Sequence, residues 1–274
     1  MTTSERYTHG HHAAVVAAHS ARTAQNSAAF LLPQLRTGQR LLDVGCGPGS
    51  ITVDLAGLID PGEVVGIDAA AGVLEQARAL AAERAVANVR FEQADCYALP
   101  FDDATFDVAY AHQVLQHVAR PLDALREMWR VLRPGGLLAV RDADYGTMMH
   151  APHDPRLDRW LRLYDTVARA NGGEPNAARH LRGWVQQAGF VDDVTTASAW
   201  IYADETGTAT WGTQWASRVS EGSFAEQAIA GGHATAAELE DLADAWRAWS
   251  VKPDAYFAFV HGEVLARRPD HRGV

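Results

Sequence analysis

The sequence predicts an α/β fold, a three-layer sandwich built on a mostly parallel, seven-stranded sheet. Between residues 40 and 140, short apolar runs alternate with amphipathic stretches, which is the pattern of successive strand–helix–strand units. Proline-glycine pairs at 61–62 and 134–135 mark the turns that lead from a helix back into a strand. A chain of 274 residues is long enough to bury such a core as one domain.

The individual elements follow from the spacing of apolar residues. Short apolar runs predict strands at residues 40–44, 64–67, 89–92, 106–111, 137–141, 190–201 and 255–266. Apolar side chains at helical spacing predict helices at 72–87, 122–132 and 155–170. A further helix ends at Gly189, because glycine commonly follows the last turn of a helix. The regular alternation stops after Arg141.

The remaining segments are expected to be additions to this sheet. Residues 1–39 form an N-terminal helical arm with one helix over 12–35, whose alanine-rich face packs on the sheet. Residues 40–274 form the main domain, with helical lid insertions near 142–175 and 202–254.

Composition excludes several classes of protein. A content of 47% hydrophobic and 21% charged residues is ordinary for a globular protein, and no apolar run reaches the roughly 18 residues that span a bilayer. The N-terminus lacks a basic segment followed by an apolar stretch, so we expect a cytoplasmic protein without a membrane partner. The net charge of -10 opposes binding to nucleic acid, which draws on clustered Lys and Arg.

The cysteines and histidines do not predict a metal site. Cys46 and Cys96 lack metal-ligand spacing, and we expect both to be free thiols. The histidines are scattered except for His9, His11 and His12, which are interpreted as part of a polar arm.

A glycine-rich loop follows the first predicted strand. Gly45, Gly47 and Gly49 stand between Val44, which ends the strand, and Ser50, which opens a helix. Glycine allows the chain to turn sharply and a ligand to approach its backbone. An ordinary strand-to-helix turn would also explain these residues by themselves.

Polar residues follow the next strands. Asp68 ends the second strand, where it could accept hydrogen bonds from ribose hydroxyls or cap the following helix. Asp95 follows the third strand and could accept from a purine amine or stabilise a turn. His112 follows the fourth strand, at the edge where open sheets bind ligands, although a structural role is the alternative. The series favours a nucleotide-type ligand.

Two details oppose a nicotinamide dehydrogenase. The loop has the pattern Gly-x-Gly-x-Gly, and it lacks the third glycine of the dinucleotide pattern Gly-x-Gly-x-x-Gly. Asp43 stands where the strand meets the loop, and a carboxylate there suits an ammonium group better than a diphosphate. A cationic, zwitterionic ligand is therefore favoured.

Four segments carry a family resemblance: LLDVGCGPG, VVGIDAA, ADCYALPFDDATFDVAYAHQVLQHV and MWRVLRPGGLLAV. Their order and spacing resemble those of class I (Rossmann-like) S-adenosylmethionine-dependent methyltransferases, especially the ubiquinone/menaquinone biosynthesis group. The resemblance covers residues 40–142 strongly and implies S-adenosyl-L-methionine as the cofactor. It also implies that the methionine part lies among Asp43, Gly45, Gly47 and Gly49, the ribose at Asp68 and Ala69, the adenine between Asp95 and Cys96, and the sulfonium and substrate at His112.

The N-terminal segment YTHGHHAAVVAAHSARTAQNSAAFLL resembles an arm that folds over the cofactor in a subset of these enzymes. Its polar candidates for cofactor binding are Tyr7, His11, His12, Arg22 and Asn26, with Arg22 able to clamp the methionine carboxylate. The alternative is that these side chains face solvent on an alanine-rich helix.

The two lids are rich in aromatic residues. Their tryptophans fill a small core of the lid itself or, alternatively, line an apolar or aromatic substrate pocket. The residues in question are Trp160, Trp211, Trp215, Trp246 and Trp249, with Tyr145, Met148, Met149 and Tyr164.

The function implied is transfer of a methyl group to an O, N or C nucleophile of a small-molecule acceptor. His112 is the leading candidate for a catalytic base, and Asp142, Asp144 and His150 of the lid are others. The alternative is a cofactor-binding scaffold or partner subunit that does not methylate. A monomer and a homodimer both remain open.

Overall fold

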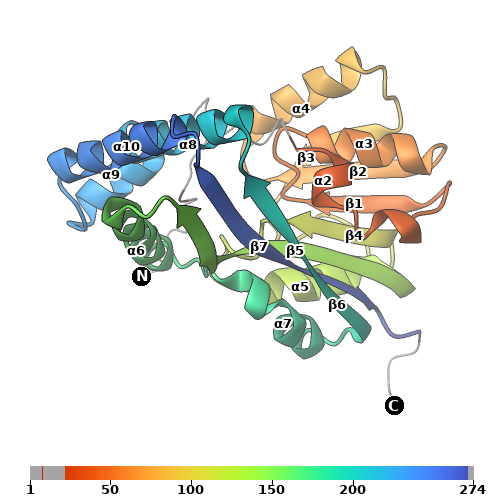
Figure 1. Cartoon of the computed structure of the whole chain (residues 1–274). Helices are drawn as coiled ribbons and strands as arrows, with labels where there is room; N and C mark the ends of the chain where they lie inside the picture. Colours follow the sequence, from red (N-terminus) through yellow and green to blue (C-terminus); the bar gives the residue numbers. More distant parts are fainter. Residues whose placement is uncertain (1–7, 9–21, 271–274) are drawn as a thin grey trace.

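The computed structural model describes residue 8 and residues 22–270 (Figure 1). Six strands run in the same direction, and the last strand of the chain pairs antiparallel with the strand on either side of it. The predicted seven-stranded, mostly parallel sheet is confirmed, with the order β3-β2-β1-β4-β5-β7-β6. The strands are β1 Arg40–Val44, β2 Glu63–Asp68, β3 Val89–Gln93, β4 Phe106–His112, β5 Leu132–Ala151, β6 Val191–Tyr202 and β7 Tyr256–Arg267.

Helices cover both faces of the sheet. The helices α3 (Ser50–Ile59) and α4 (Ala71–Glu83) lie on one side, and α5 (Pro121–Val131) and α7 (Leu181–Gln187) lie on the other (Figure 1). Because side chains alternate along a strand, neighbouring residues serve opposite layers. Leu41 of β1 packs in the core beneath α3, whereas Leu42 packs in the core beneath α5.

The lid helices gather beyond one end of the sheet (Figure 1). They are α6 (Pro155–Ala170), α8 (Glu205–Ser220), α9 (Ser223–Ala230) and α10 (Ala236–Ser250). The five lid tryptophans are all buried, and Trp160 meets Trp215 and Trp246 edge to face, with ring centroids 4.4 and 4.8 Å apart. The interpretation that these tryptophans fill the lid's own core is therefore confirmed.

The predicted end of regular structure after Arg141 is wrong. Strand β5 continues to Ala151, and its residues 142–144 and 149–151 pair with β7 on either side of a register shift. The usual alternation of apolar and polar residues is missing from this part of the strand, because charged residues, Asp142 and Asp144, occupy two of its buried positions. Pairing with a distant strand, rather than local propensity, determines the structure of this segment.

The helix predicted over residues 12–35 is also wrong where it can be compared. Residues 12–21 lie outside the described residues, and residues 22–35 contain only the single turn α2 (Ala24–Ser27) and the 3-10 turn η1 (Leu32–Gln34). The first turn ends at Ala28, whose φ of -130° and ψ of 15° leave the helical region, and Pro33, which has no backbone N–H, lies within the separate 3-10 turn. Ala24 and Ala28 nevertheless pack on the sheet as expected.

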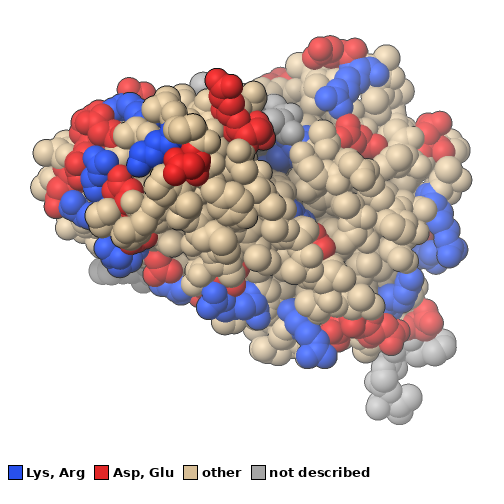
Figure 2. All heavy atoms as spheres, viewed as in Figure 1, with Lys and Arg blue, Asp and Glu red and all other residues tan. Residues whose placement is uncertain are grey.

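The surface of the lid carries more charged side chains than the middle of the same face of the molecule (Figure 2). In Figure 2, acidic and basic side chains are interspersed over the lid helices, and few charges lie over the middle of this face. This face lacks the continuous basic area that contacts with a phosphate backbone require. Among the helices within residues 22–270, none combines the length and the apolar composition of a membrane span.

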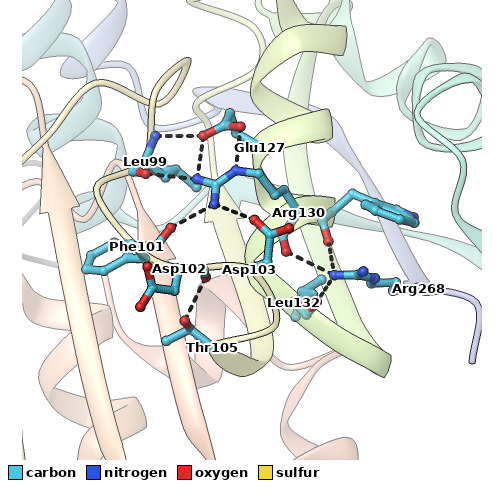
Figure 3. A network of polar contacts seen from close by, with 10 residues as sticks. Leu99, Phe101, Asp102, Asp103, Thr105, Glu127, Arg130, Leu132 and Arg268 are labelled. Atoms are coloured by element: carbon cyan, nitrogen blue, oxygen red, sulfur yellow. Dashed lines mark hydrogen bonds and ion pairs between the residues drawn. The ribbon is translucent and has the colours of Figure 1, made fainter.

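A network around Arg130 fastens α5 to the loop between β3 and β4 (Figure 3). Its guanidinium donates to both carboxylate oxygens of Glu127, each at 2.8 Å, and to the carbonyl oxygens of Leu99 and Phe101 at 2.9 and 2.7 Å. The Glu127 carboxylate in turn accepts from the Leu99 amide at 2.8 Å. The network fixes the loop that begins at Asp95, one of the predicted cofactor residues.

We expect Glu127→Gln to lower the free energy of unfolding at pH 7 by about 1–2 kcal/mol, because it removes a charge-assisted pair. The Arg130 guanidinium holds the pKa of Glu127 below its ordinary value of 4.5. This contribution is therefore present above pH 4.5 and is lost as the pH falls through the lowered folded pKa. Urea unfolding of both proteins across this range should show the difference shrinking in acid.

The matched control is Glu75→Gln, which removes an exposed pair with Arg78 on α4. Its effect should stay below about 0.5 kcal/mol. A loss in Glu127→Gln that is the same at every pH would contradict the assigned role.

Candidate active site

The glycine loop and Asp68 meet at the carboxyl ends of β1 and β2. One Asp68 carboxylate oxygen accepts from the Gly47 amide at 3.1 Å, and the other accepts from the Ala70 amide at 2.9 Å. The alternative prediction, that Asp68 caps the following helix, is wrong, because the N-cap residue of α4 is Ala70. Asp68 instead joins the glycine loop to the turn that precedes α4.

The loop has an open side and a packed side. Gly47 has a φ of 54°, and a Cβ placed there would meet no atom within 4 Å. Gly49 has a φ of 80°, and a Cβ there would lie 2.7 Å from the Ala77 Cβ, so only glycine lets α3 begin so close to α4. The backbone around Gly47 is therefore accessible to a ligand while the loop is held from behind.

Asp43 lies buried at the end of β1. Its carboxylate accepts from the Thr52 hydroxyl at 2.6 Å, and the residue is 2% exposed. Burial raises the pKa of Asp43 to about 7, the nearby Asp68 adds to the rise, and the Thr52 hydrogen bond opposes it. A cationic group beside this carboxylate would favour its ionised form. The site thus fits a ligand that carries an ammonium group.

The predicted adenine and ribose residues lie along the same edge of the sheet. Asp95 is exposed, and its side chain accepts from the Tyr97 amide at 2.9 Å, so it stabilises a turn as one interpretation predicted. Ala69 is exposed and Cys96 is half-buried. Cys46 and Cys96 are both free thiols, as expected.

Of the arm residues, Tyr7, His11 and His12 lie outside the described residues. The Arg22 guanidinium donates to the Gln113 side-chain oxygen at 2.6 Å and lies 5.5 Å from the centre of the Trp200 ring. Asn26 is exposed and forms a capping box with Thr23, which is a local structural role. Arg22 is thus directed towards the end of β4.

His112 ends β4 and is buried, with its Nδ1 3.5 Å from a guanidinium nitrogen of Arg141. A guanidinium can only donate, so Nδ1 is the acceptor and a neutral ring carries its proton on Nε2. This contact favours a neutral His112 ring whose Nε2 is the hydrogen-bond donor.

The sequence did not reveal the buried charges beside His112. Arg141 donates to Glu263 at 3.2 Å and to the Ser198 hydroxyl at 3.1 Å, and it lies 5.0 Å from the centre of the Trp200 ring. Arg141 and Glu263 are 1% and 6% exposed. The only signal in the sequence was Arg141, a charged residue at the end of an apolar strand. Its partner, Glu263, lies 122 residues away in the sequence.

The other candidate bases are occupied by structural contacts. Asp142 is fully buried, its Oδ1 accepts from the Gln116 amide at 3.0 Å, its Oδ2 has no hydrogen-bond partner among residues 22–270, and burial raises its pKa to about 8. Asp144 forms a two-fold hydrogen bond with Arg179 at 2.6 Å. His150 lies 3.7 Å from Asp158 at the base of the lid.

Comparisons with known proteins agree with this geometry. Residues 42–140 match the family model described as "Methyltransferase domain". The chain is 31% identical to the uncharacterized methyltransferase C1B3.06c of Schizosaccharomyces pombe, over 96% of this chain and 97% of that one. It is 44% identical to the ubiquinone/menaquinone biosynthesis C-methyltransferase UbiE of Azotobacter vinelandii, over 40% and 44% of the two chains.

A solved structure, that of the [4+2]-cyclase SpnF, matches with a TM-score of 0.54 and 25% identity. The match covers 92% of this chain and 85% of that one. With an open glycine loop above a buried carboxylate and a relative aligned along nearly its whole length, the chain belongs to the class I S-adenosylmethionine-dependent methyltransferases, and S-adenosylmethionine is its cofactor.

Proposed function

We propose that this enzyme transfers the methyl group to an O, N or C nucleophile of a small, aromatic or apolar acceptor. The observation that carries the proposal is the placement of two sites side by side at the carboxyl edge of the sheet. Asp43 and the glycine loop end β1, and His112 ends β4, which pairs directly with β1.

We propose the following division of the cofactor site. Asp43 and the open backbone around Gly47 support binding of the methionine part, because a carboxylate and bare peptide groups suit a zwitterion. Asp68 with Ala69 would hold the ribose, and Asp95 with Cys96 would flank the adenine. When bound, S-adenosylmethionine supplies an electrophilic methyl group, whose transfer leaves a neutral thioether.

The chain itself contributes mainly positioning and exclusion of water. Trp200 lies near His112, with ring centroids 6.0 Å apart, and it makes a T-shaped contact with Phe259 at 5.8 Å between ring centroids. His112 would donate from Nε2 to an electron-rich atom of the acceptor. An acceptor that is already ionised then needs no base from the protein.

The test of this function is mass-spectrometric detection of methylated product from a panel of hydroxylated and aminated aromatic compounds. Calorimetry with the demethylated cofactor, S-adenosylhomocysteine, should show binding, and Asp68→Ala should weaken it by about tenfold or more because a charged acceptor is lost. Absence of binding by the wild-type protein would overturn the proposal, as would unchanged affinity of Asp68→Ala.

The SpnF likeness favours a second candidate, a protein that binds the cofactor but does not methylate, because that neighbour is named as a cyclase. Tight binding of S-adenosylhomocysteine, together with no methylated product from any acceptor in the panel, would favour this candidate. Product formation excludes it.

The affinity for S-adenosylhomocysteine should depend on pH through Asp43. Its pKa is about 7, and only the ionised carboxylate attracts the ligand's ammonium group. Below pH 7 the dissociation constant should rise by up to about tenfold per pH unit. Asp43→Asn should bind weakly at pH 8 and show a flatter profile in calorimetry from pH 5.5 to 8.5.

Asp60→Asn is the matched control, since Asp60 is exposed at the other end of α3. It should keep both the affinity and the pH dependence of the wild type. A pH profile of Asp43→Asn as steep as that of the wild type would refute the role of Asp43.

The role of His112 can be tested with two substitutions. Glutamine can place an amide donor near the position of Nε2, whereas alanine cannot. If His112 donates, kcat of His112→Gln should exceed that of His112→Ala by about tenfold. His112 would instead be assigned as a base if both variants lost kcat equally and the wild-type kcat fell in acid with the titration of one group.

A further inference from the structure

Three side chains from distant parts of the chain form a relay beside His112. Arg22 donates to the Gln113 side-chain oxygen at 2.6 Å, and the Gln113 side-chain nitrogen lies 2.7 Å from Nε2 of His261 on β7. Gln113 has a φ of 54°, which is uncommon for a residue with a side chain, and its amide is held by the Arg141 carbonyl at 2.7 Å. Such backbone strain concentrates at functional sites.

The relay determines which nitrogen of His261 carries the proton. A guanidinium has no acceptor, so the Gln113 atom that faces Arg22 is the oxygen, and the atom that faces His261 is the NH2 group. Because that group only donates, Nε2 of His261 is the acceptor. The neutral ring must then carry its proton on Nδ1. Burial, together with the charges of Arg141 and Arg22, lowers the pKa of His261 well below its usual value, which keeps the ring neutral.

The Nδ1–H group of His261 is buried and unsatisfied. The residue is 0% exposed, and Nδ1 meets no hydrogen-bond partner in the described part of the chain. A buried donor without an acceptor costs about 1–3 kcal/mol. A buried polar group in this state calls for a physical explanation, and a group of the substrate that accepts the hydrogen bond is one such explanation.

The surroundings of His261 indicate what kind of acceptor would satisfy it. Its ring centroid lies 4.4 Å from that of Trp200, 4.8 Å from that of Phe259 and 6.2 Å from that of His112. The neighbouring rings are therefore aromatic, and His261 lies next to the end of β4. The cation of Arg22, at the far end of the relay, favours a partner atom with negative charge.

We infer that His261 is a substrate-binding residue whose Nδ1–H donates to a hydroxylate or carbonyl oxygen of an aromatic methyl acceptor. This inference rests on the proposed function and adds the chemical class of the acceptor. Gln113 and Arg22 are positioning residues, because they act through the orientation and tautomer of His261.

Nuclear magnetic resonance tests the tautomer without any turnover. In protein labelled with ¹⁵N-histidine and saturated with S-adenosylhomocysteine, His261 should show the Nδ1–H pattern at neutral pH, with its signals assigned by their loss in His261→Asn. Adding 4-methylphenol should shift the Nδ1 signal, whereas toluene, which lacks only the hydroxyl group, should not. An Nε2–H pattern, or equal responses to the two probes, would overturn the inference.

Two matched substitutions test the role in turnover of a phenolic acceptor from the panel. Asparagine retains a donor near the position of Nδ1, and glutamine retains a polar group near Nε2. We expect KM to stay within about threefold in His261→Asn and to rise by about tenfold or more in His261→Gln. The affinity for S-adenosylhomocysteine should be unchanged in both.

Equal KM values in the two variants would refute the subsite while leaving methyl transfer intact. A wild-type protein that neither binds S-adenosylhomocysteine nor forms product would instead refute the proposed function. The tautomer experiment keeps these two failures distinguishable, because it does not require product formation.

Discussion

The two halves of the proposed active site depend on one close contact, between Gly45 after β1 and Val114 after β4. A Cβ at Gly45 would lie 2.4 Å from a methyl carbon of Val114, and Gly45 has a φ of 72°. Only glycine permits this approach. Because β1 and β4 are neighbours with Val44 opposite Ala111, the glycine loop packs directly on the loop that follows β4.

The loop after β4 is held equally firmly from its other side. Gln116 donates its amide to the buried Asp142, accepts from the Ala143 amide at 2.9 Å, and accepts at its carbonyl from the Glu174 amide at 2.9 Å. Asp142 and Ala143 make these bonds from the part of β5 that continues past Arg141. The bonds explain why acidic residues that resemble candidate bases in the sequence are structural in the fold.

Local sequence patterns predicted what local interactions determine. The helix predicted over 155–170 matches Pro155–Ala170, because its apolar spacing and the Asp154 N-cap lie in one continuous segment. The glycine loop and Asp68 were also recognisable, since each directly follows a strand. Arg22 was predicted as a cofactor-binding residue, but its contacts in the relay could not be predicted, because Arg22 and Gln113 are 91 residues apart and Gln113 and His261 are 148 apart. The extension of β5 beyond Arg141 was not predicted for the same reason, because pairing with the distant strand β7 determines it.

The burial of aromatic residues in the lid core has a consequence for specificity towards the acceptor. The five lid tryptophans are buried in a core that they share with Phe257 and Phe259, so they are not available to line a pocket. Trp200 differs, because it is only half-buried, lies on β6 and donates to the Asn26 carbonyl of the arm at 3.2 Å. Since β7 carries both Phe259 and His261, packing of the lid core also determines where His261 stands. Changes in acceptor preference should therefore arise from Trp200 and His261, while changes among the lid tryptophans and Phe259 act first on stability.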